Sequence, residues 1–366
     1  MSDDARFMQA ALGLAARGLG RVWPNPAVGC LIVRDGRIVG RGRTADGGRP
    51  HAETVALSQA GGMARGATAY VTLEPCAHHG VTPPCADALI ETGVARVVVA
   101  LRDPDPRVDG GGVARLREAG IEVTEGVCEP EARALQSGFL TRIRNGRPAL
   151  TLKLATTLDG RIATATGESQ WITGEAARRH VHARRAAHDA ILVGAGTARA
   201  DDPALTVRGF GDVPQPIRVV LSRSLDLALE LKLVRTARDI PTWFLHSSGD
   251  PAPFEAAGVR CHSILHTDAG GVDVLEALAI LGREGLTRVY CEGGGQLAAS
   301  LLAAGLVDRL ELYSAGAVIG AEGRPSIGPM GLNLLARAPR MELLTSRAIG
   351  ADLYTVWESS SEPTTP

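Results

Sequence analysis

The chain has 366 residues, 45% of them hydrophobic and 22% charged, so it is long enough for two domains that each bury a core. Its 39 Lys and Arg are balanced by 40 Asp and Glu, so there is no basic surplus to neutralise a nucleic-acid backbone, and a nucleic-acid substrate is disfavoured. The six scattered cysteines are too few for a disulfide scaffold, which leaves metal binding or core packing as their expected uses.

The first 18 residues, MSDDARFMQAALGLAARG, predict an amphipathic helix and not a targeting signal. They begin with acids where a signal peptide carries bases, and their apolar residues recur on one helical face. No apolar run in the chain approaches the roughly 20 residues of a membrane-spanning helix. We therefore expect a soluble, cytoplasmic protein that makes no membrane contact.

Both halves alternate short β-branched runs with helical patterns, which predicts two α/β domains. In the first half we expect strands at 28–33, 69–73, 97–101 and 121–124, with helices at 52–60, 86–92 and 113–119. In the second half we expect strands at 149–155, 190–193, 217–221, 242–246, 288–291 and 309–313, with helices at 175–187, 272–282 and 296–304.

The segment 137–148, SGFLTRIRNGRP, is basic and ends in Asn-Gly and Pro, which favours a domain joint there. The domains are therefore expected at 1–146 and 147–358. The remaining residues, 359–366, are polar and predict a disordered tail.

A His-x-Glu motif at His51 and Glu53, followed by Pro75-Cys76 and then Cys85, is the pattern of zinc-dependent nucleobase deaminases. His51, Cys76 and Cys85 would leave the fourth zinc position to a water, whose pKa the metal lowers to about 7. Glu53 would then move protons. The pattern predicts a catalytic zinc site in the first domain.

His78 and His79, in the loop between the two cysteines, are alternative ligands. A site made of the two cysteines and His78 would be a local clip, but it would leave the His-x-Glu pair without a role. The simpler interpretation is that His78 and His79 are solvated or face the substrate. The other four cysteines are expected to be small buried hydrophobes: Cys30, Cys128, Cys261 and Cys291.

Two glycine turns in the second half join a strand to a helix, at 193–197 and at 289–296 (VYCEGGGQ). Backbone N–H groups in such turns, with the helix start that follows, can hold a phosphate. Neither matches G-x-G-x-x-G, so an ordinary Rossmann site is not indicated. After the strand ending at 221, the hydroxyls and the guanidinium of Ser222, Arg223 and Ser224 would suit the 2′-phosphate of a dinucleotide, although an ordinary surface loop is the favoured interpretation.

The chain resembles the bifunctional bacterial riboflavin-biosynthesis family, in which a diaminohydroxyphosphoribosylaminopyrimidine deaminase is joined to a 5-amino-6-(5-phosphoribosylamino)uracil reductase. The resemblance covers about residues 7–357. The matching motifs stand in this order: PNPAVGC (24–30), PHAE (50–53), VTLEPCAHHGVTPPC (71–85), LKLATTLDGRIAT (152–164), GESQWITG (167–174), ADDPALTVR (200–208) and EGGGQL (292–297).

The resemblance implies a cytidine-deaminase-like three-layer sandwich followed by a dihydrofolate-reductase-like α/β domain. It implies one Zn²⁺ in the first domain, NADPH in the second, small phosphoribosyl pyrimidine substrates, and a homodimer or higher homo-oligomer. The implied reactions are hydrolytic deamination of 2,5-diamino-6-(5-phosphoribosylamino)pyrimidin-4(3H)-one and then reduction of its ribosyl group to ribityl.

By matching position, His51, Cys76 and Cys85 would bind zinc and Glu53 would shuttle protons. The implied substrate contacts are Lys153, Ser169, Arg185, Leu205, Arg208 and Glu292. The implied NADPH contacts are Ala155, Trp171, Thr197, Asp201, Gly293, Gly294 and Gly295, to which the strand-end pattern adds Ser222. Asp159 also lies in a family motif. Arg185 and Arg208 are candidates to clamp the 5′-phosphate.

Two positions depart from the family pattern. Many relatives carry His where Thr44 stands, which puts a phosphate or ring contact from that position in doubt, and the usual Pro is replaced by Gly316. Three other hypotheses compete: a tRNA-editing type of deaminase, which would need a basic face; a binding protein with a structural zinc and four protein ligands; and a deaminase with a decayed reductase half.

Overall fold

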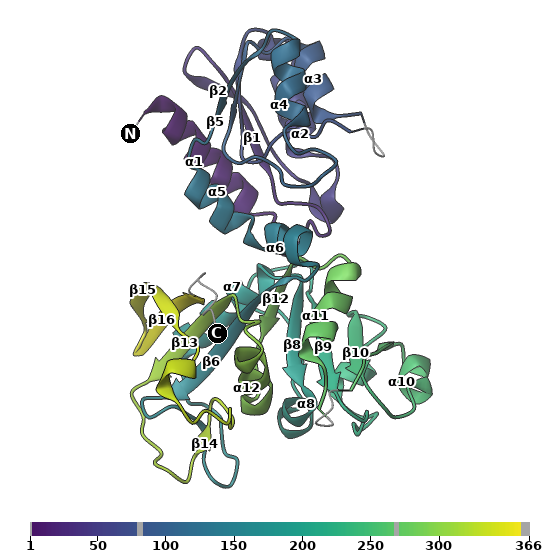
Figure 1. Ribbon diagram of the computed structural model, residues 1–366, viewed down its shortest axis with the longest axis vertical. Helices are drawn as coiled ribbons and strands as arrows, with labels where there is room; N and C mark the ends of the chain where they lie inside the picture. Colours follow the sequence, from purple (N-terminus) through teal and green to yellow (C-terminus); the bar gives the residue numbers. More distant parts are fainter. Residues whose placement is uncertain (1, 79–82, 267–270, 360–366) are drawn as a thin grey trace. The chain divides into compact units, whose positions relative to one another are not determined.

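The computed structural model describes residues 2–78, 83–266 and 271–359. The chain divides into two compact units, Met1–Arg147 and Pro148–Pro366, which we call unit 1 and unit 2 (Figure 1). Both are α/β, as the alternating sequence pattern predicts. Among the described residues, no helix combines the length and the apolar character needed to cross a membrane.

Unit 1 is built on one five-stranded sheet with the order β2-β1-β3-β4-β5. Strand β1 pairs in an antiparallel manner with β2 and β3, whereas β3, β4 and β5 are parallel. The carboxyl ends of the parallel strands therefore meet at one edge of the sheet. The strand bounds are Gly29–Arg34 (β1), Arg37–Arg43 (β2), Thr68–Val71 (β3), Arg96–Val99 (β4) and Glu122–Glu125 (β5).

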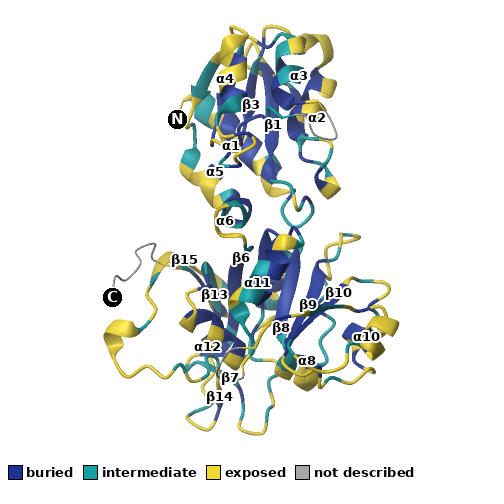
Figure 2. Ribbon diagram, turned by 45° about the vertical axis from the view of Figure 1, so that its right-hand side comes forward, coloured by how far each residue is buried: buried dark blue, intermediate teal, exposed yellow. Residues whose placement is uncertain are grey.

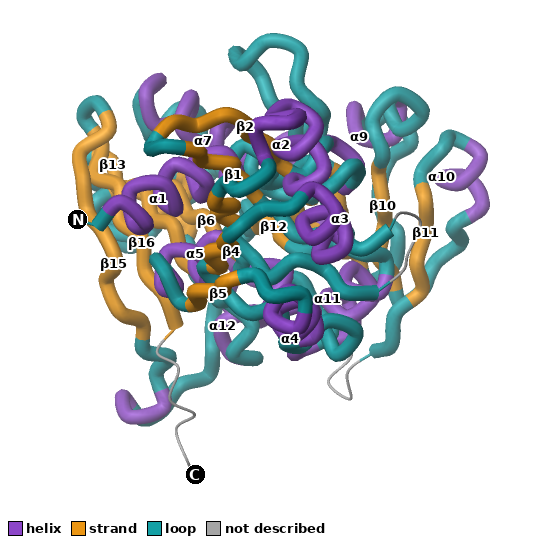
Figure 3. Tube along the Cα trace, turned by 90° about the horizontal axis from the view of Figure 1, so that it is seen from above, coloured by secondary structure: helices purple, strands orange, loops and turns teal. Residues whose placement is uncertain are grey.

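Helices cover both faces of this sheet, which makes the predicted three-layer sandwich (Figures 1 and 3). Helices α1 and α5 lie together on one face, and α2, α3 and α4 lie on the other. Their bounds are Asp3–Ala16 (α1), Ala52–Ala60 (α2), Cys85–Thr92 (α3), Gly111–Glu118 (α4) and Glu129–Leu135 (α5). Helix α1 is the amphipathic helix expected at the N-terminus, and the Ser2 side chain caps it by accepting from the Ala5 N–H.

Strand β2 is missing from the sequence prediction, because RIVGRGR reads as a charged, glycine-rich loop. Its glycines allow helix α2 to pack directly on the strand backbone. A Cβ at Gly42 would lie 2.2 Å from the Ala52 carbonyl oxygen, and one at Gly40 would lie equally close to that of Ala56. A contact between two backbones leaves no hydrophobic pattern in the sequence. It also seats the start of α2, where His51 lies, firmly against the sheet.

Unit 2 contains a nine-stranded sheet with the order β11-β10-β9-β8-β12-β6-β13-β16-β15. Neighbours are parallel from β11 to β13, and β16 and β15 complete the sheet as an antiparallel hairpin. The bounds are Ala149–Thr157 (β6), Ala190–Gly194 (β8), Ile217–Ser222 (β9), Thr242–His246 (β10), Arg260–Ser263 (β11), Arg288–Cys291 (β12), Arg309–Ala315 (β13), Met341–Ile349 (β15) and Asp352–Ser359 (β16). A separate short pair joins β7 (Arg161–Ala163) and β14 (Arg324–Pro325).

The helices of unit 2 are α7 (Glu175–Ala186), α8 (Ala195–Asp201), α9 (Lys232–Arg235), α10 (Ala252–Ala256), α11 (Val274–Arg283) and α12 (Gly295–Ala303). The central strands are buried and the connecting segments are exposed (Figure 2). After β8 the chain moves outward to β9, and after β12 it moves the other way to β13. This reversal marks the crevice beyond the carboxyl ends of β8 and β12 as the expected ligand site of the sheet.

The structure adds detail at the two predicted domain limits. The segment predicted as a joint forms helix α6, Ser137–Asn145, because Phe139 and Leu140 pack into the core of unit 1; the unit boundary follows at Arg147. The predicted tail begins inside a strand, since Ser359 is the last residue of β16, and residues 360–366 lie outside the described part of the chain. Of the cysteines expected in the core, Cys30 and Cys291 are buried, whereas Cys128 and Cys261 are half-buried.

Candidate functional site

The three predicted zinc ligands converge in unit 1. The Nδ1 atom of His51 and the Sγ atoms of Cys76 and Cys85 all lie within 4.8 Å of one another. His51 is the N-cap residue of α2 and Cys85 is the first residue of α3, while Cys76 lies on the loop after β3. The starts of two neighbouring helices thus place an imidazole and a thiol beside the second thiol.

The chemistry of these donors fits a zinc ion. The Cys85 side chain, by a hydrogen bond, and His51 lower the pKa of the Cys76 thiol to about 4, which makes Cys76 a thiolate at neutral pH. Its sulfur also accepts a hydrogen bond from the Cys85 backbone N–H at 3.2 Å. Thiolate and imidazole are preferred zinc ligands, and three protein ligands are typical of a catalytic site that keeps one position open.

Glu53 follows His51 by two residues and lies in the first turn of α2, with only 4% of its surface exposed. Burial, reinforced by the nearby charge of Cys76, raises the pKa of its carboxyl group to about 7. A group with such a pKa can both accept and donate a proton near neutral pH, as general acid–base catalysis requires.

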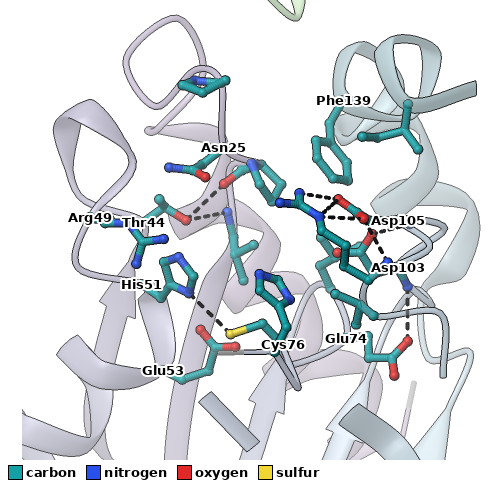
Figure 4. A pocket seen from close by; sticks show the side chains of 18 of the residues that line it. Asn25, Thr44, Arg49, His51, Glu53, Glu74, Cys76, Asp103, Asp105 and Phe139 are labelled. Atoms are coloured by element: carbon teal, nitrogen blue, oxygen red, sulfur yellow. Dashed lines mark hydrogen bonds and ion pairs between the residues drawn. The ribbon is translucent and has the colours of Figure 1, made fainter. Parts of the chain in front are cut away.

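A cavity of about 300 Å³ opens onto these residues (Figure 4). His51, Glu53 and Cys76 lie at its floor. One wall carries Asn25, Thr44 and Arg49, and the other carries Glu74, Asp103 and Asp105, with Phe139 of α6 above them. The cavity is therefore polar on both sides and has an aromatic ring at its mouth.

The acidic wall was not foreseen from the sequence. Glu74 is buried and accepts hydrogen bonds from four backbone N–H groups, those of Asp103, Gly110, Gly112 and Val113. It thereby fastens the loop that carries Cys76 to the start of α4. Burial raises the pKa of the neighbouring Asp103 carboxyl to about 6. Both acidic residues follow the carboxyl ends of parallel strands, a position that could have identified them.

The remaining sequence hypotheses for unit 1 concern His78, His79 and Thr44. Within the described residues the three-ligand cluster contains His51 and not His78, which lines the cavity with its Nδ1 atom buried. His79 lies outside the described residues. The Thr44 hydroxyl accepts from the Val28 N–H and donates to the Pro26 carbonyl, so it supports the cavity wall. The second departure, Gly316, is exposed with open space around it.

In unit 2 the predicted substrate contacts include a buried ion pair. Arg185 of α7 donates to Glu292 through Nε at 2.6 Å and through Nη2 at 2.9 Å, and both side chains are nearly buried. Burial of Glu292 alone would raise its pKa, but the charge and hydrogen bonds of Arg185 lower it to about 2. Lys153 lies on neighbouring β6, directly after Leu152, which pairs with Cys291; burial lowers its pKa and the charge of Glu292 opposes the effect.

The predicted NADPH contacts on the two glycine turns lie side by side. The Gly194 N–H after β8 donates to the Gly293 carbonyl after β12, and the Thr197 hydroxyl lies 3.1 Å from the position of a Cβ on Gly294. A Cβ on Gly295 would lie 2.9 Å from the Pro325 carbonyl oxygen, so this close approach requires glycine. The turns, and the start of α12, lie beyond the carboxyl ends of β8 and β12, where the strand order reverses.

Other predicted residues of unit 2 have mixed placements. Ala155 lies on β6 and packs against the tyrosine cluster under α7, while Asp201 ends α8 near Lys153. Leu205 packs its side chain in the core, which leaves its backbone for any ligand contact. The Ser222 hydroxyl is buried and accepts from the Leu225 N–H, a local turn contact.

The remaining predicted ligand contacts of unit 2 lie on exposed connecting segments, mainly the loop before α7 and the segment after α8. Ser169 is half-buried and Trp171 is exposed, with the Arg178 guanidinium 4.7 Å from the centre of its ring. Arg208 is exposed. Asp159 accepts from the Gly320 N–H at 2.7 Å and so fixes a loop after β13. These placements do not test the predicted ligand contacts, which stay predictions.

The metal-ligand set makes a direct prediction. Replacing Cys85 with Ser should reduce the zinc content of the purified protein from about one ion per chain to near zero, because the site loses a soft ligand. Cys128→Ser is the matched control, because Cys128 is not one of the three clustered ligands. It is the N-cap residue of α5, and its thiol lies near the Ala5 carbonyl. Atomic absorption measures both variants. Full zinc retention in the Cys85 variant would exclude the proposed ligand set.

Comparison with known proteins agrees with both units. The family model for the cytidine and deoxycytidylate deaminase zinc-binding region matches residues 1–101, and that for the RibD C-terminal domain matches residues 148–355. Riboflavin biosynthesis protein RibD of Escherichia coli K12 is 44% identical over 363 residues, which cover 96% of this chain and 98% of that protein.

Solved structures agree over the same length. A RibD structure from Acinetobacter baumannii has a TM-score of 0.89 and 39% identity, and the match covers 98% of this chain and 99% of that one. A Thermotoga maritima structure, titled a diaminohydroxyphosphoribosylaminopyrimidine deaminase/5-amino-6-(5-phosphoribosylamino)uracil reductase, has a TM-score of 0.85 and 34% identity over the same shares.

A deaminase-type zinc region followed by a RibD-type C-terminal domain defines a two-domain class, and it confirms the predicted fold. The chain belongs to the riboflavin biosynthesis protein RibD family.

Proposed function

We propose that this protein catalyses two successive steps of riboflavin biosynthesis. Unit 1 hydrolytically deaminates 2,5-diamino-6-(5-phosphoribosylamino)pyrimidin-4(3H)-one with zinc, and unit 2 then reduces the ribosyl group to ribityl with NADPH. Family membership supports both reactions. The observation that carries the proposal is the convergence of His51, Cys76 and Cys85 beside buried Glu53 at the floor of one cavity.

The deamination exchanges an amino group for a water oxygen. A zinc ion held by His51, Cys76 and Cys85 would lower the pKa of a water in the open fourth position to about 7. Glu53 accepts a proton from the attacking water and delivers it to the ring nitrogen. It then delivers a proton to the departing amino group, which leaves as ammonia. The buried carboxyl group suits this double role because its pKa of about 7 is close to the working pH.

The reduction is assigned to the crevice beyond β6, β8 and β12. NADPH would supply hydride to the C1 carbon of the ribosyl group. Arg185 holds Glu292 by two hydrogen bonds, and the charges of Glu292 and Lys153 interact. Arg185 therefore orients Glu292 toward the substrate, and exposed Arg208 is the better candidate to clamp the 5′-phosphate. The glycine turns at 194–197 and 293–295 would hold the cofactor phosphates.

Two measurements on the purified protein test this proposal: ammonia release from the diaminopyrimidinone nucleotide, and NADPH oxidation when the deaminated nucleotide is supplied. Both activities are expected. A structural zinc protein would give neither, and a chain with a decayed reductase half would give ammonia release alone. A tRNA-editing deaminase would release ammonia from tRNA and not from the nucleotide. The homodimer or higher homo-oligomer implied by the family resemblance is part of this proposal, and sedimentation analysis tests it.

A further inference from the structure

The two walls of the unit 1 cavity carry different groups. On the acidic wall, Arg107 donates to Asp105 through Nε and Nη2, and Glu74 accepts four backbone N–H groups. Arg142 of α6 lines the same cavity; burial and then the charge of nearby Arg107 lower its pKa, and the charge of Asp105 opposes them. A phosphate placed here would meet carboxylate oxygens. The acidic wall therefore suits the N–H edges of a pyrimidine better than a phosphate.

The opposite wall offers a different set of groups: Asn25, Thr44 and Arg49 (Figure 4). Thr44 is 2% exposed, and its hydroxyl accepts from the Val28 N–H and donates to the Pro26 carbonyl. Its one O–H donor is therefore already used and is not offered to a substrate phosphate. Arg49 is half-buried and brings a guanidinium to the same wall, above His51. A guanidinium binds phosphate bidentately, which a threonine cannot do.

The loop that presents Arg49 is fixed at several points. The Ala45 N–H donates to the Pro50 carbonyl at 3.0 Å, and the Gly47 N–H donates to the Arg21 carbonyl at 2.8 Å. The side-chain amide of Asn25 donates to the Gly48 carbonyl at 3.1 Å. A rigid loop holds a charged side chain in place before the ligand arrives, which lowers the entropic cost of binding.

We propose that Arg49 binds the 5′-phosphate of the pyrimidine nucleotide in unit 1, and that it thereby sets the preference of the deaminase site for phosphorylated pyrimidines. This inference rests on the proposed deamination and names the group that recognises its substrate. In this arrangement each wall has a role: the acidic wall contacts the base, and the wall that carries Arg49 contacts the phosphate. The pyrimidine carbon that reacts then lies at the floor, beside Glu53.

The test compares ammonia release from the phosphorylated substrate and from its dephosphorylated riboside. In Arg49→Met we expect KM for the phosphorylated substrate to rise about 10- to 100-fold, the loss typical of a hydrogen-bonded charge pair. We expect kcat and the riboside KM to stay close to wild type, and zinc content to be unchanged. Arg49→Lys should recover part of the loss, because lysine keeps the charge but not the bidentate geometry.

Two matched arginines serve as controls. Arg41→Met removes an exposed arginine of β2 and should leave both KM values unchanged. Arg142→Met removes one of the two arginines on the acidic wall, the other being Arg107, and should keep the preference for the phosphorylated substrate. An equal loss on both substrates in the Arg49 variants would overturn the proposal, as would loss of zinc or loss of the preference in the Arg142 variant alone.

A binding measurement separates this inference from the proposed function. Calorimetry with ribose 5-phosphate should show a binding event in the wild type that Arg49→Met weakens at least tenfold. If the wild type released no ammonia from either pyrimidine, the proposed function would fail, yet this titration would still decide whether Arg49 binds a sugar phosphate. Equal affinity in wild type and variant would refute the phosphate role.

Discussion

Replacing Glu53 with Gln is expected to lower the rate of ammonia release by about 10²- to 10⁴-fold, the usual contribution of a general acid–base group. Gln keeps the size of the side chain but cannot accept a proton from water. Because Glu53 is buried beside the three ligands and is not one of them, the variant should bind as much zinc as the wild type. Ammonia release under saturating substrate, together with metal analysis, measures both effects.

Glu91→Gln provides the control for this loss. Glu91 is an exposed residue of α3, so removing its charge should change neither the rate nor the zinc content. If the Glu53 variant retained near-normal turnover, another group would have to move the proton. Asp103, whose pKa is raised to about 6 by burial in the same cavity, would be the first residue to examine.

Replacing Glu292 with Gln is expected to cost unit 2 about 3 to 5 kcal/mol of stability, because it leaves the Arg185 guanidinium buried without its partner charge. Urea unfolding followed by tryptophan fluorescence measures the loss, since three of the four tryptophans lie in unit 2: Trp171, Trp243 and Trp357. The same variant should lose NADPH oxidation, because Glu292 directly follows β12 and its charge interacts with that of Lys153 at the proposed reductase site.

The exposed pair of Arg199 and Asp226 supplies the comparison, and Asp226→Asn should cost less than about 1 kcal/mol. Replacing Glu292 and Arg185 together with Met should recover much of the lost stability, since neither charge is then left unpaired. A loss in the Glu292 variant no larger than that of the surface variant would show that the buried pair contributes little.

The same pair predicts a pH dependence. The folded-state pKa of Glu292 is about 2, below the ordinary value of 4.5, so its stabilisation is fully present above about pH 4.5. The stabilisation is lost as the pH falls toward 2 and the carboxylate takes up a proton. The difference in unfolding free energy between wild type and Glu292→Gln should therefore shrink over this interval. A difference that stayed constant from pH 5 to pH 2.5 would contradict the assignment.

The elements that carry the zinc ligands could be predicted because their sequence signals are local. The pattern at 52–60 starts directly after His51, and that at 86–92 starts directly after Cys85, so two helix starts were expected beside two ligands. The structure has α2 at Ala52–Ala60 and α3 at Cys85–Thr92. Hydrophobic periodicity likewise identified the buried parallel strands of unit 2, because strands covered on both faces are nearly continuous apolar runs.

The features that escaped prediction depend on contacts between distant segments. Strand β2 is held by backbone packing against α2, and strand β15 is exposed along nearly its whole length without alternation, so neither gives a clear pattern. The acidic wall of the cavity forms only when the loop after β3 meets the start of α4 through Glu74. The pairing of Arg185 with Glu292 spans 107 residues and could not be read from spacing.

The most direct test of the two-site account is NADPH oxidation by protein from which zinc has been removed with a chelator. With the deaminated nucleotide supplied, oxidation should proceed at the wild-type rate, because the proposed reductase residues all belong to unit 2. With the diaminopyrimidinone nucleotide supplied, oxidation should stop and return when zinc is added back. Loss of both activities in zinc-free protein that remains folded would contradict the claim of two separate sites.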